Sequence, residues 1–557
     1  MKPSGISFKK QPLPTLELLI IVFLAIIPLF VTFPYRVNIF LSWEGAYRMS
    51  EGQLPFRDFG TPLGGMYWVI PSVFFKIFGT DMITLVKAQV FINILSGLAF
   101  RSILKSLYVQ PGIRFVSVLL YCISFSFFNF WPWYNHTVIV YELIAIAFLL
   151  KGIFATQSSK QILWLCGAGV FTCFSFLTKQ DAGGMAFLLC LGLIVISSFY
   201  TKKWLLPVIY FISFSVLLGI VVSVFSKYGF GYWFNHGQAP HSARISVFEI
   251  INEFFGASPW IKFYLFVILI LLLVQHKKIK DLFSELRDLL FLLLTLGILL
   301  QAAVFQVTSY TPPDNNIFFH SFAIAFILTL LFDLLNKNAS SFKMVSGLAI
   351  GVLLWWSSIF WKYVVRVVER AFPPNTEIVS SSGENVVNRD TYMIKKPDSL
   401  DVPMTDWTFS KLRSFRKIYM PSSTIKGIER LLNLPIVKNN ENLKVLNMSE
   451  LTPLAVEIPY KLETGSHYPL WNHLGVGMFN KQAEMFESRI RDHEYDLVLF
   501  EYIPTLNNFF PFRVRDALKT NYSLVDSFIA PRRGDTGGMI EVYIKPSENN
   551  LDSVLVK

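Results

Sequence analysis

Long stretches without a charged residue constrain the fold of this 557-residue chain more than any other feature. Leu18–Tyr35, Trp204–Phe225 and Leu289–Phe305 contain no acidic or basic side chain. A run of roughly 20 apolar residues crosses a bilayer as a helix, because backbone polar groups in lipid must pair within the segment. The chain is 16% charged, against roughly 25% in a soluble protein. These patterns predict a polytopic α-helical membrane protein.

About eleven segments meet the criteria of hydropathy and length for a transmembrane helix. They cover residues 15–34, 82–105, 112–130, 137–155, 161–178, 184–200, 204–226, 259–275, 289–307, 317–335 and 343–361. The first segment is too long for the core of a signal peptide and no small-residue cleavage site follows it. We therefore expect it to be retained.

Basic residues collect in every second loop between these segments, which is the pattern of cytoplasmic loops. They are Lys2, Lys9, Lys10, Arg101, Lys105, Lys160, Lys202, Lys203, Lys277, Lys278, Lys280, Arg287, Lys337 and Lys343. The pattern predicts a cytoplasmic N-terminus and, with an odd number of spans, an extracytoplasmic C-terminal part. It also accounts for the net charge of +12 without a nucleic-acid partner. The four cysteines all lie in expected spans, so no disulfide framework or zinc spacing is present.

Two parts are expected: a membrane core over residues 1–362, with a first external loop at 35–81, and a domain over 363–557. Within the loop, residues 66–78 are amphipathic and too short to span, which favours an interfacial helix. From Met420 onwards, helical and strand-like runs alternate, which predicts an extracytoplasmic α/β domain. The expected helices cover 425–432 and 481–491, and the expected strands cover 444–447, 497–500, 522–529 and 539–544. No nucleotide-binding motif occurs in this domain.

The first external loop carries the most informative motif. It reads Ser-Trp-Glu-Gly-Ala-Tyr-Arg over residues 42–48, then Pro-Phe-Arg-Asp-Phe over 55–59, and Pro-Leu-Gly-Gly over 62–65. A carboxylate beside aromatic groups at a membrane surface is partly desolvated, which makes it a stronger base. Glu44 and Asp58 are therefore candidate general bases for an acceptor hydroxyl. The alternative is a surface loop with ordinary charge pairs, such as Glu44 with Arg48, one helical turn apart.

A second motif, Leu-Thr-Lys-Gln-Asp-Ala-Gly-Gly over residues 177–184, lies at the outer end of the fifth expected span. A lysine next to glycines at a membrane interface can hold a lipid phosphate as a flexible point charge. Lys179 and Gln180 are therefore candidate substrate-binding residues. A lysine that only marks the end of a helix is the alternative.

These two motifs resemble the GT-C membrane glycosyltransferases, in particular the bacterial branch similar to dolichyl-phosphate-mannose–protein mannosyltransferases and to lipid A aminoarabinose transferase. The resemblance covers roughly residues 15–340. The family usually opens its first loop with Asp-Glu-Gly, and in this chain Trp43 stands where that Asp is expected. The resemblance implies an inverting transfer of a sugar from a polyprenyl-phosphate donor to an extracytoplasmic glycan, lipid or protein acceptor. It also implies a bacterial inner membrane, with Glu44 or Asp58 as the base.

Five further residues are candidates for contacts with the donor phosphate or the acceptor. They are Arg57, Lys87, Arg244, Asn316 and His320. Lys87 lies within an expected span, where an unpaired charge is costly. A lone histidine at the start of a helix is more often structural than functional. The run Asp314-Asn315-Asn316 and the Glu44/Asp58 pair could also hold a divalent cation, although neither spacing is diagnostic of one.

Two other classes of protein fit part of the pattern. A transporter or flippase for a lipid-linked glycan would show paired discontinuous helices and intramembrane charges in both halves. The sequence has few charges in mid-span and no repeat of one half in the other. A non-catalytic scaffold that displays the external domain is compatible with the replacement of the expected Asp by Trp43.

Overall fold

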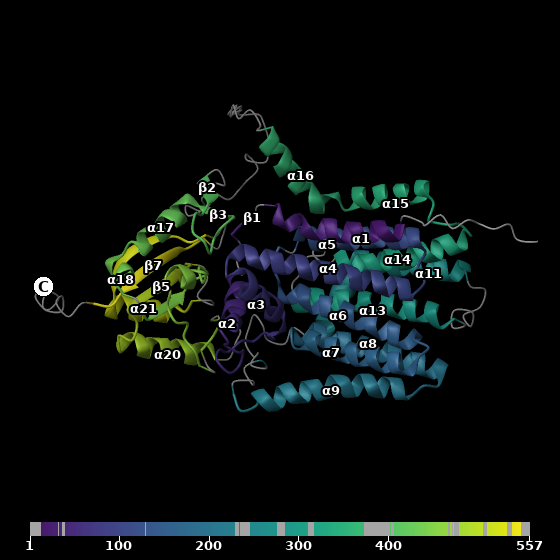
Figure 1. Ribbon diagram of the computed structural model, residues 1–557, viewed down its shortest axis with the longest axis horizontal. Helices are drawn as coiled ribbons and strands as arrows, with labels where there is room; N and C mark the ends of the chain where they lie inside the picture. The colour runs from purple at the N-terminus through teal and green to yellow at the C-terminus, as the bar shows by residue number, and fades with distance from the viewer. Residues whose placement is uncertain are drawn as a thin grey trace, which may run out of the picture.

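The structure is a computed structural model, and it describes most of the chain between residues 13 and 546. The described residues are 13–31, 33–35, 39–128, 130–228, 233, 246–275, 285–309, 317–372, 402, 406–440, 442–465, 468–470, 472, 478–504, 510–531 and 537–546. A bundle of long helices forms one end of the molecule and an α/β domain forms the other (Figure 1). Two shorter helices, α2 (Ile39–Ser50) and α3 (Met66–Phe78), lie between these parts.

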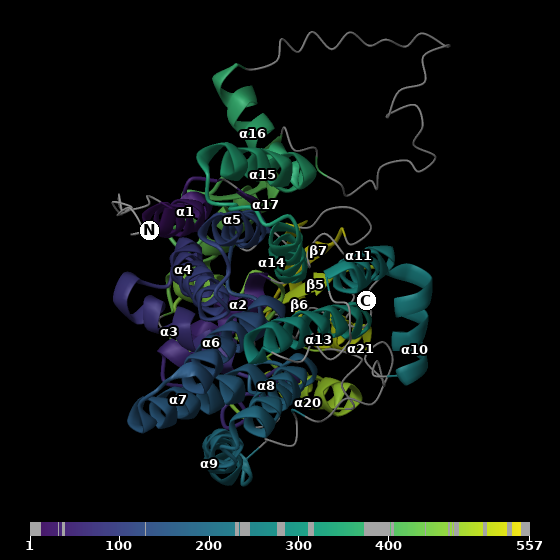
Figure 2. The same ribbon diagram turned by 90° about the vertical axis from the view of Figure 1, so that its right-hand side faces the viewer.

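The bundle contains a helix at each position where the sequence predicts a span, which confirms a polytopic helical core. These helices are α1 (Leu13–Ile26), α4 (Met82–Ser106), α5 (Pro111–Phe128), α6 (Tyr134–Phe154), α7 (Ser158–Phe176), α8 (Gln180–Thr201), α9 (Leu205–Phe225), α11 (Pro259–Gln275), α13 (Leu286–Ser309), α14 (Ile317–Leu334) and α15 (Phe342–Trp355). Within the described residues, five helices are long and apolar enough to cross a membrane, or up to seven if each of two bent pairs is one span. The view along the bundle shows how the helices pack side by side (Figure 2).

Exposed apolar side chains cover the outer surface of the bundle. Only 11% of the apolar window of α9 is buried, and Phe211, Val216 and Ile220 on that helix are each about half exposed or more. A soluble protein rarely exposes so large an apolar surface, whereas lipid tails are as apolar as these side chains. The exposed face of α9 therefore has the character of a surface that contacts lipid.

Three expected boundaries are wrong. The first helix ends at Ile26 and continues only as a 3₁₀ turn, η1 (Ile27–Leu29), because Pro28 has no backbone N–H to continue the α-helix. The connection between the expected spans 204–226 and 259–275 contains a helical segment, α10 (Val247–Asn252) with η3 (Glu253–Ala257), bent by 75° against α11. The expected span 343–361 is broken at Trp356, where α16 (Ser357–Ala371) leaves α15 at 79°.

The C-terminal domain has the predicted α/β architecture. Its four-stranded sheet has the order β4 (Val445–Met448), β5 (Leu497–Tyr502), β7 (Met539–Ile544), β6 (Ser523–Ile529), and only the β4–β5 pair is parallel. The helices α20 (Phe479–Arg491) and α21 (Phe512–Asn521) cover one face, where their apolar side chains pack on Leu446, Val498 and Phe500. The helix α17 (Ser422–Leu432) packs against the other face through β6. Short helices α18 (Pro435–Lys438) and α19 (Leu454–Glu457) complete the domain.

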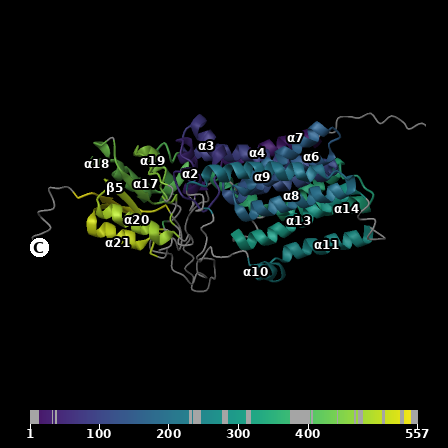
Figure 3. The same ribbon diagram turned by 90° about the horizontal axis from the view of Figure 1, so that it is seen from below.

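The domain and the 35–81 loop share one hydrophobic core. Trp43 on α2 and Trp68 on α3 belong to the same buried cluster as Ile428 of α17 and Leu499 of β5. The chain just before the loop, β1 (Phe33–Pro34), also pairs in parallel with β3 (Ile418–Pro421), which pairs in turn with β2 (Trp407–Phe409). The view from below shows α2 between the sheet and the long helices (Figure 3). The 35–81 loop is therefore fixed by its packing against the C-terminal domain and by the pairing of β1 with β3 just before it.

Candidate functional site

Glu44 lies on α2, and its carboxylate is buried. Its side chain is 9% exposed and accepts a hydrogen bond of 2.9 Å from Nε of Arg48, one helical turn further on. Arg48 is 1% exposed and also donates to Gln53 Oε1 at 2.9 Å. Its guanidinium group lies over the rings of Phe59 and Tyr468. The ion pair that the sequence offered as the structural alternative is therefore present, and it is buried.

The Glu44 side chain lines a small cavity between the loop and the C-terminal domain. The cavity has a volume of about 30 Å³ and is closed by Asn447, Tyr468 and Leu470, among others. This volume fits a water molecule and not a sugar. Burial raises the pKa of Glu44, and the attraction and hydrogen bond from Arg48 oppose that shift without cancelling it. Glu44 is thus a stronger base than an exposed glutamate.

Asp58 has a different environment in the same loop. Its Oδ2 accepts hydrogen bonds from the backbone N–H of Leu54 at 2.7 Å and from Arg57 at 2.6 Å. Partial burial tends to raise the pKa of Asp58, but these hydrogen bonds and the charges of Arg57 and Arg48 lower it overall. Its backbone carbonyl accepts from the N–H of Gly465 in the C-terminal domain at 2.7 Å. Asp58 therefore caps a turn of the loop, with a carboxylate that is a weak base.

The glycines of the loop motif permit close packing that a side chain would prevent. A Cβ atom at Gly45 would lie 2.0 Å from the indole of Trp68, which itself donates from Nε1 to the carbonyl oxygen of Leu41 at 2.8 Å. At Gly65 it would lie 2.7 Å from Cγ of Pro55. The lack of a side chain at Gly45 and Gly65 thus allows α2, the Pro55 turn and α3 to pack closely together.

The two motifs identified in the sequence contact each other directly. Gly64 of the loop donates from its N–H to the carbonyl oxygen of Thr178 at 3.2 Å, and Met66 donates to that of Leu177 at 3.4 Å. A Cβ atom at Gly64 would lie only 1.8 Å from the oxygen of Leu177. Residues more than a hundred positions apart are therefore joined by backbone hydrogen bonds, and the loop is fixed to the turn that carries Lys179.

Lys179 is the N-cap residue of α8, at the end of that helix that follows the contact with the 35–81 loop. Its side chain is 12% exposed, its Nζ lies 3.1 Å from Oδ2 of Asp181, and it lies over the ring of Phe305 on α13. Gln180 donates from Nε2 to the carbonyl oxygen of Trp233 at 2.7 Å. A lysine at the N-terminus of a long helix combines a positive charge with the positive end of the helix dipole. In the structure, the carboxylate of Asp181 is the anion beside the ammonium group of Lys179.

Two other candidates lie in aromatic surroundings. The Nζ of Lys87 lies 5.0 Å from the centroid of the Phe78 ring at the end of α3, and among the described residues no carboxylate pairs with it. His320 packs against Trp260 at 4.1 Å between ring centroids and shares a hydrogen bond of 2.9 Å with the hydroxyl of Tyr264. The contacts of His320 join α14 to α11, so the structural explanation accounts for this residue.

Two candidate residues lie outside the described part of the chain, and two residues around the site carry no signal in the sequence. Arg244 and Asn316 lie outside the described residues. Within the described residues, no group of three or more His, Cys, Asp or Glu side chains could hold a metal ion. Sequence reasoning missed Tyr468 and Glu463, which enclose the Glu44–Arg48 pair from the C-terminal domain. No motif marks these two residues, since only the tertiary structure brings them to the loop.

Comparison with known proteins gives structural neighbours only. No family model matches the chain, and no curated protein sequence matches it. The chain is similar to ArnT from Cupriavidus metallidurans in the apo state, with 12% identity and a TM-score of 0.49 over 95% of this chain and 97% of that chain. For ArnT bound to undecaprenyl phosphate, the identity is 11% and the TM-score 0.44 over 96% and 98% of the two chains. For the oligosaccharyltransferase from Archaeoglobus fulgidus, they are 11% and 0.37 over 88% and 68%.

Proposed function

We propose that this protein is a membrane glycosyltransferase that moves a sugar from a polyprenyl-phosphate carrier to an acceptor hydroxyl on the extracytoplasmic side. The observation that carries this proposal is the contact of Gly64 and Met66 with the 177–178 turn. It joins the loop that bears a buried carboxylate to the helix end that bears a partly buried lysine. A transferase with a lipid-phosphate donor needs these two groups, a base and a phosphate-binding cation, at the level of the membrane surface.

Lys179 is the proposed phosphate-binding residue on the donor side. Its ammonium group and the N-terminus of α8 together favour an anion, and Asp181 supplies one in the structure. A lipid phosphate would compete with Asp181 for Lys179 and would be stabilised as it becomes the leaving group. Arg57, with a side chain that is 38% exposed, is a second cation on the loop. The donor's lipid tail would lie against the apolar helices.

Glu44 is the proposed general base, in preference to Asp58. The pKa of Glu44 is raised by burial, whereas the pKa of Asp58 is lowered overall by its hydrogen bonds and nearby cations. In the proposed step Glu44 takes the proton of the acceptor hydroxyl, whose oxygen forms a bond to the anomeric carbon. The bond from that carbon to the phosphate oxygen breaks, and the lipid phosphate leaves with the electron pair. A single displacement of this kind inverts the anomeric configuration.

The C-terminal domain would have to admit the acceptor. Tyr468 and Leu470 close the space beside Glu44, and the space is too small for a sugar. An acceptor that reaches Glu44 therefore passes between the loop and the domain, so both contribute to its recognition. We place the N-terminus in the cytoplasm and the domain outside it, in a bacterial inner membrane, as the basic loops and the motif resemblance favour.

The test is transfer of label from a panel of radiolabelled polyprenyl-phosphate sugars by the purified full chain in lipid, with an envelope extract as acceptor. Glu44→Gln should abolish transfer while the binding of undecaprenyl phosphate is retained. Glu51→Gln is the matched control, because Glu51 is exposed seven positions further along the same loop. Near-normal turnover in Glu44→Gln would reject Glu44 as the base.

The same panel addresses the other two functional classes. Donor-dependent movement of label across the bilayer without a glycosylated product would support a flippase. A folded protein that neither transfers nor translocates any donor, with acceptor present, would support a scaffold.

A further inference from the structure

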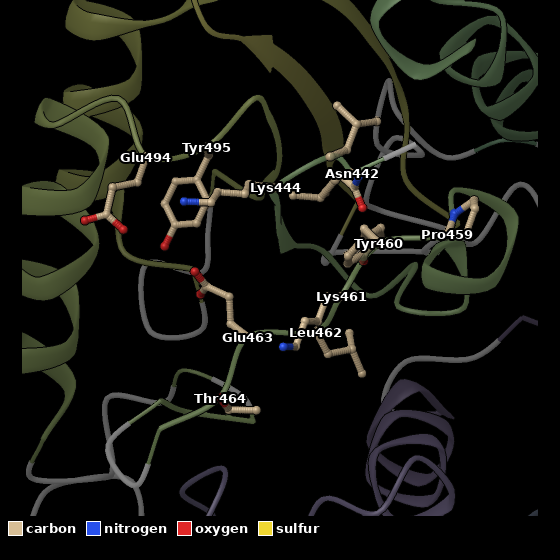
Figure 4. A pocket seen from close by; sticks show the side chains of 12 residues that line it. Asn442, Lys444, Pro459, Tyr460, Lys461, Leu462, Glu463, Thr464, Glu494 and Tyr495 are labelled. Carbon is tan, nitrogen blue, oxygen red and sulfur yellow. The ribbon is translucent and has the colours of Figure 1, made fainter. Parts of the chain in front are cut away.

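A larger cavity lies in the C-terminal domain next to the Glu44–Arg48 pair. It has a volume of about 480 Å³ and lies between the segments 442–445 and 459–464 and the residues Glu494 and Tyr495. Figure 4 shows the side chains that surround it, from the segment that leads into β4, the connection after α19 and the turn just before β5. Pockets that bind small ligands commonly have volumes of roughly 300–1,000 Å³. The cavity is thus large enough for one or two sugar rings.

The lining of this cavity suits an uncharged polar ligand. Tyr460 and Tyr495 form buried aromatic walls, and the polar groups of Asn442 and Thr464 lie at exposed positions around them. The lining includes two lysines, Lys444 and Lys461, and two glutamates, Glu463 and Glu494, so the formal charges of the lining cancel. A site for a phosphate or a uronic acid would carry an excess of cations. Aromatic rings with scattered hydrogen-bonding groups instead match a saccharide, which has apolar ring faces and hydroxyl groups at its edge.

The wall of the cavity is connected to the proposed base. The carbonyl oxygen of Glu463 accepts a hydrogen bond of 2.7 Å from Arg48, which is paired with Glu44. On the other side, the hydroxyl of Tyr460 accepts from Nδ2 of Asn447 at 3.3 Å, and Asn447 lines the small cavity beside Glu44. The wall of the larger cavity is therefore joined to the Glu44–Arg48 pair through Glu463, and to the small cavity beside Glu44 through Tyr460 and Asn447.

We infer that this cavity binds an uncharged saccharide unit of the acceptor glycan and so holds the acceptor near Glu44. The identification of this saccharide as part of the acceptor rests on the proposed function. The binding of a saccharide in the cavity does not depend on transfer. The substrate class that follows is a glycan with neutral sugar rings next to its reactive hydroxyl, rather than an anionic lipid or a bare protein side chain.

The binding experiment uses the purified full chain in nanodiscs without any donor. Saturation-transfer NMR is recorded with a panel of uncharged pyranose disaccharides and with the matching uronic-acid disaccharides. Thr464→Trp fills the cavity from an exposed position and should weaken the binding of the uncharged sugar by roughly tenfold or more. Lys461→Ala removes an exposed lining residue, and Lys481→Ala, an exposed lysine on α20 outside the cavity, is its control.

The outcomes separate this inference from the proposed function. Binding of an uncharged disaccharide that Thr464→Trp weakens and Lys481→Ala leaves unchanged supports the cavity, even in a protein that transfers nothing. Absence of binding by every uncharged disaccharide, preference for the uronic acids, or equal binding by Thr464→Trp and wild type would each overturn it. In a protein that does transfer, Thr464→Trp should raise the KM for the acceptor and leave the KM for the donor unchanged.

Discussion

Arg48 donates a hydrogen bond of 2.7 Å to the carbonyl oxygen of Glu463, 415 positions further along the chain. The same guanidinium group is paired with Glu44 at 2.9 Å. One buried cation therefore holds the proposed base and fixes the C-terminal domain on the 35–81 loop. Because its side chain is 1% exposed, water screens both contacts much less than it screens contacts at the surface.

Arg48→Ala should be strongly destabilising. The change leaves the carboxylate of Glu44 buried without its partner, and breaking a buried ion pair in this way costs about 3–5 kcal/mol. Thermal unfolding of the detergent-purified protein and limited proteolysis between loop and domain would measure the loss. Arg57→Ala is the control, because its pair with Asp58 is partly exposed and such pairs contribute roughly 0–1 kcal/mol. Equal shifts in Tm for the two variants would contradict a stabilising role of Arg48 between loop and domain.

The pH dependence of transfer should report on Glu44. A general base must be ionised, so activity falls when the pH drops below its pKa, and burial places that pKa above the ordinary value of a glutamate. The acidic limb of the profile for kcat should therefore lie above the usual glutamate range and move in Glu44→Asp. Glu51→Gln should leave the limb in place. An acidic limb at the ordinary carboxylate pKa would favour Asp58 or another group.

The same shift predicts the direction of the change in stability. A carboxyl group whose pKa is raised in the folded state binds its proton more tightly when folded than when unfolded. The contribution of Glu44 to stability is then fully present below its unfolded pKa and is lost as the pH rises through the raised pKa. Replacement by Gln removes this pH-dependent contribution. The difference in Tm between wild type and Glu44→Gln should thus change across that interval, and a constant difference would contradict the assigned shift.

Gly64→Ala should disrupt the contact between the two motifs. The added Cβ atom would lie 1.8 Å from the carbonyl oxygen of Leu177, and backbone cannot move aside as a flexible side chain can. Overpacking of this kind costs about 1–3 kcal/mol. Gly192→Ala, within α8, is the control because a Cβ atom there meets nothing within 4 Å. We expect lower Tm and lower transfer for Gly64→Ala alone, and wild-type behaviour from both variants would show that the contact is not needed.

The positions of the helices were predictable because each apolar run is long and uninterrupted. The prediction failed where a helix breaks without a change in composition. Trp356 lies inside the expected span 343–361, and no proline or glycine stands at the break. The 3₁₀ turn at Pro28 did have a local signal, since proline cannot donate the hydrogen bond that continues an α-helix.

The candidate site was predictable only in its local parts. The pair of Glu44 with Arg48 follows from helical spacing, and the strands and helices after Met420 follow from alternation of short apolar runs. The partners of that pair do not follow from any pattern. Tyr468 and Glu463 reach Arg48 from the far end of the chain, and the cavity between β4 and Tyr495 arises from the packing of loops. Contacts between residues so far apart along the chain cannot be predicted from the pattern of a single sequence.

Lys179→Met should weaken donor binding while the protein remains folded. The change removes the charge and keeps a side chain of similar length, and a hydrogen bond to a charged group contributes about 1.5–3 kcal/mol. Undecaprenyl phosphate should therefore bind roughly tenfold or more weakly. Lys203→Met, an exposed lysine just beyond the opposite end of α8, is the control. The variant also leaves Asp181 without its ion pair, so the double variant Lys179→Met/Asp181→Asn separates the two effects. If the double variant binds the donor as well as wild type, the loss in the single variant came from the unpaired Asp181. If the loss persists, Lys179 acts on the phosphate itself.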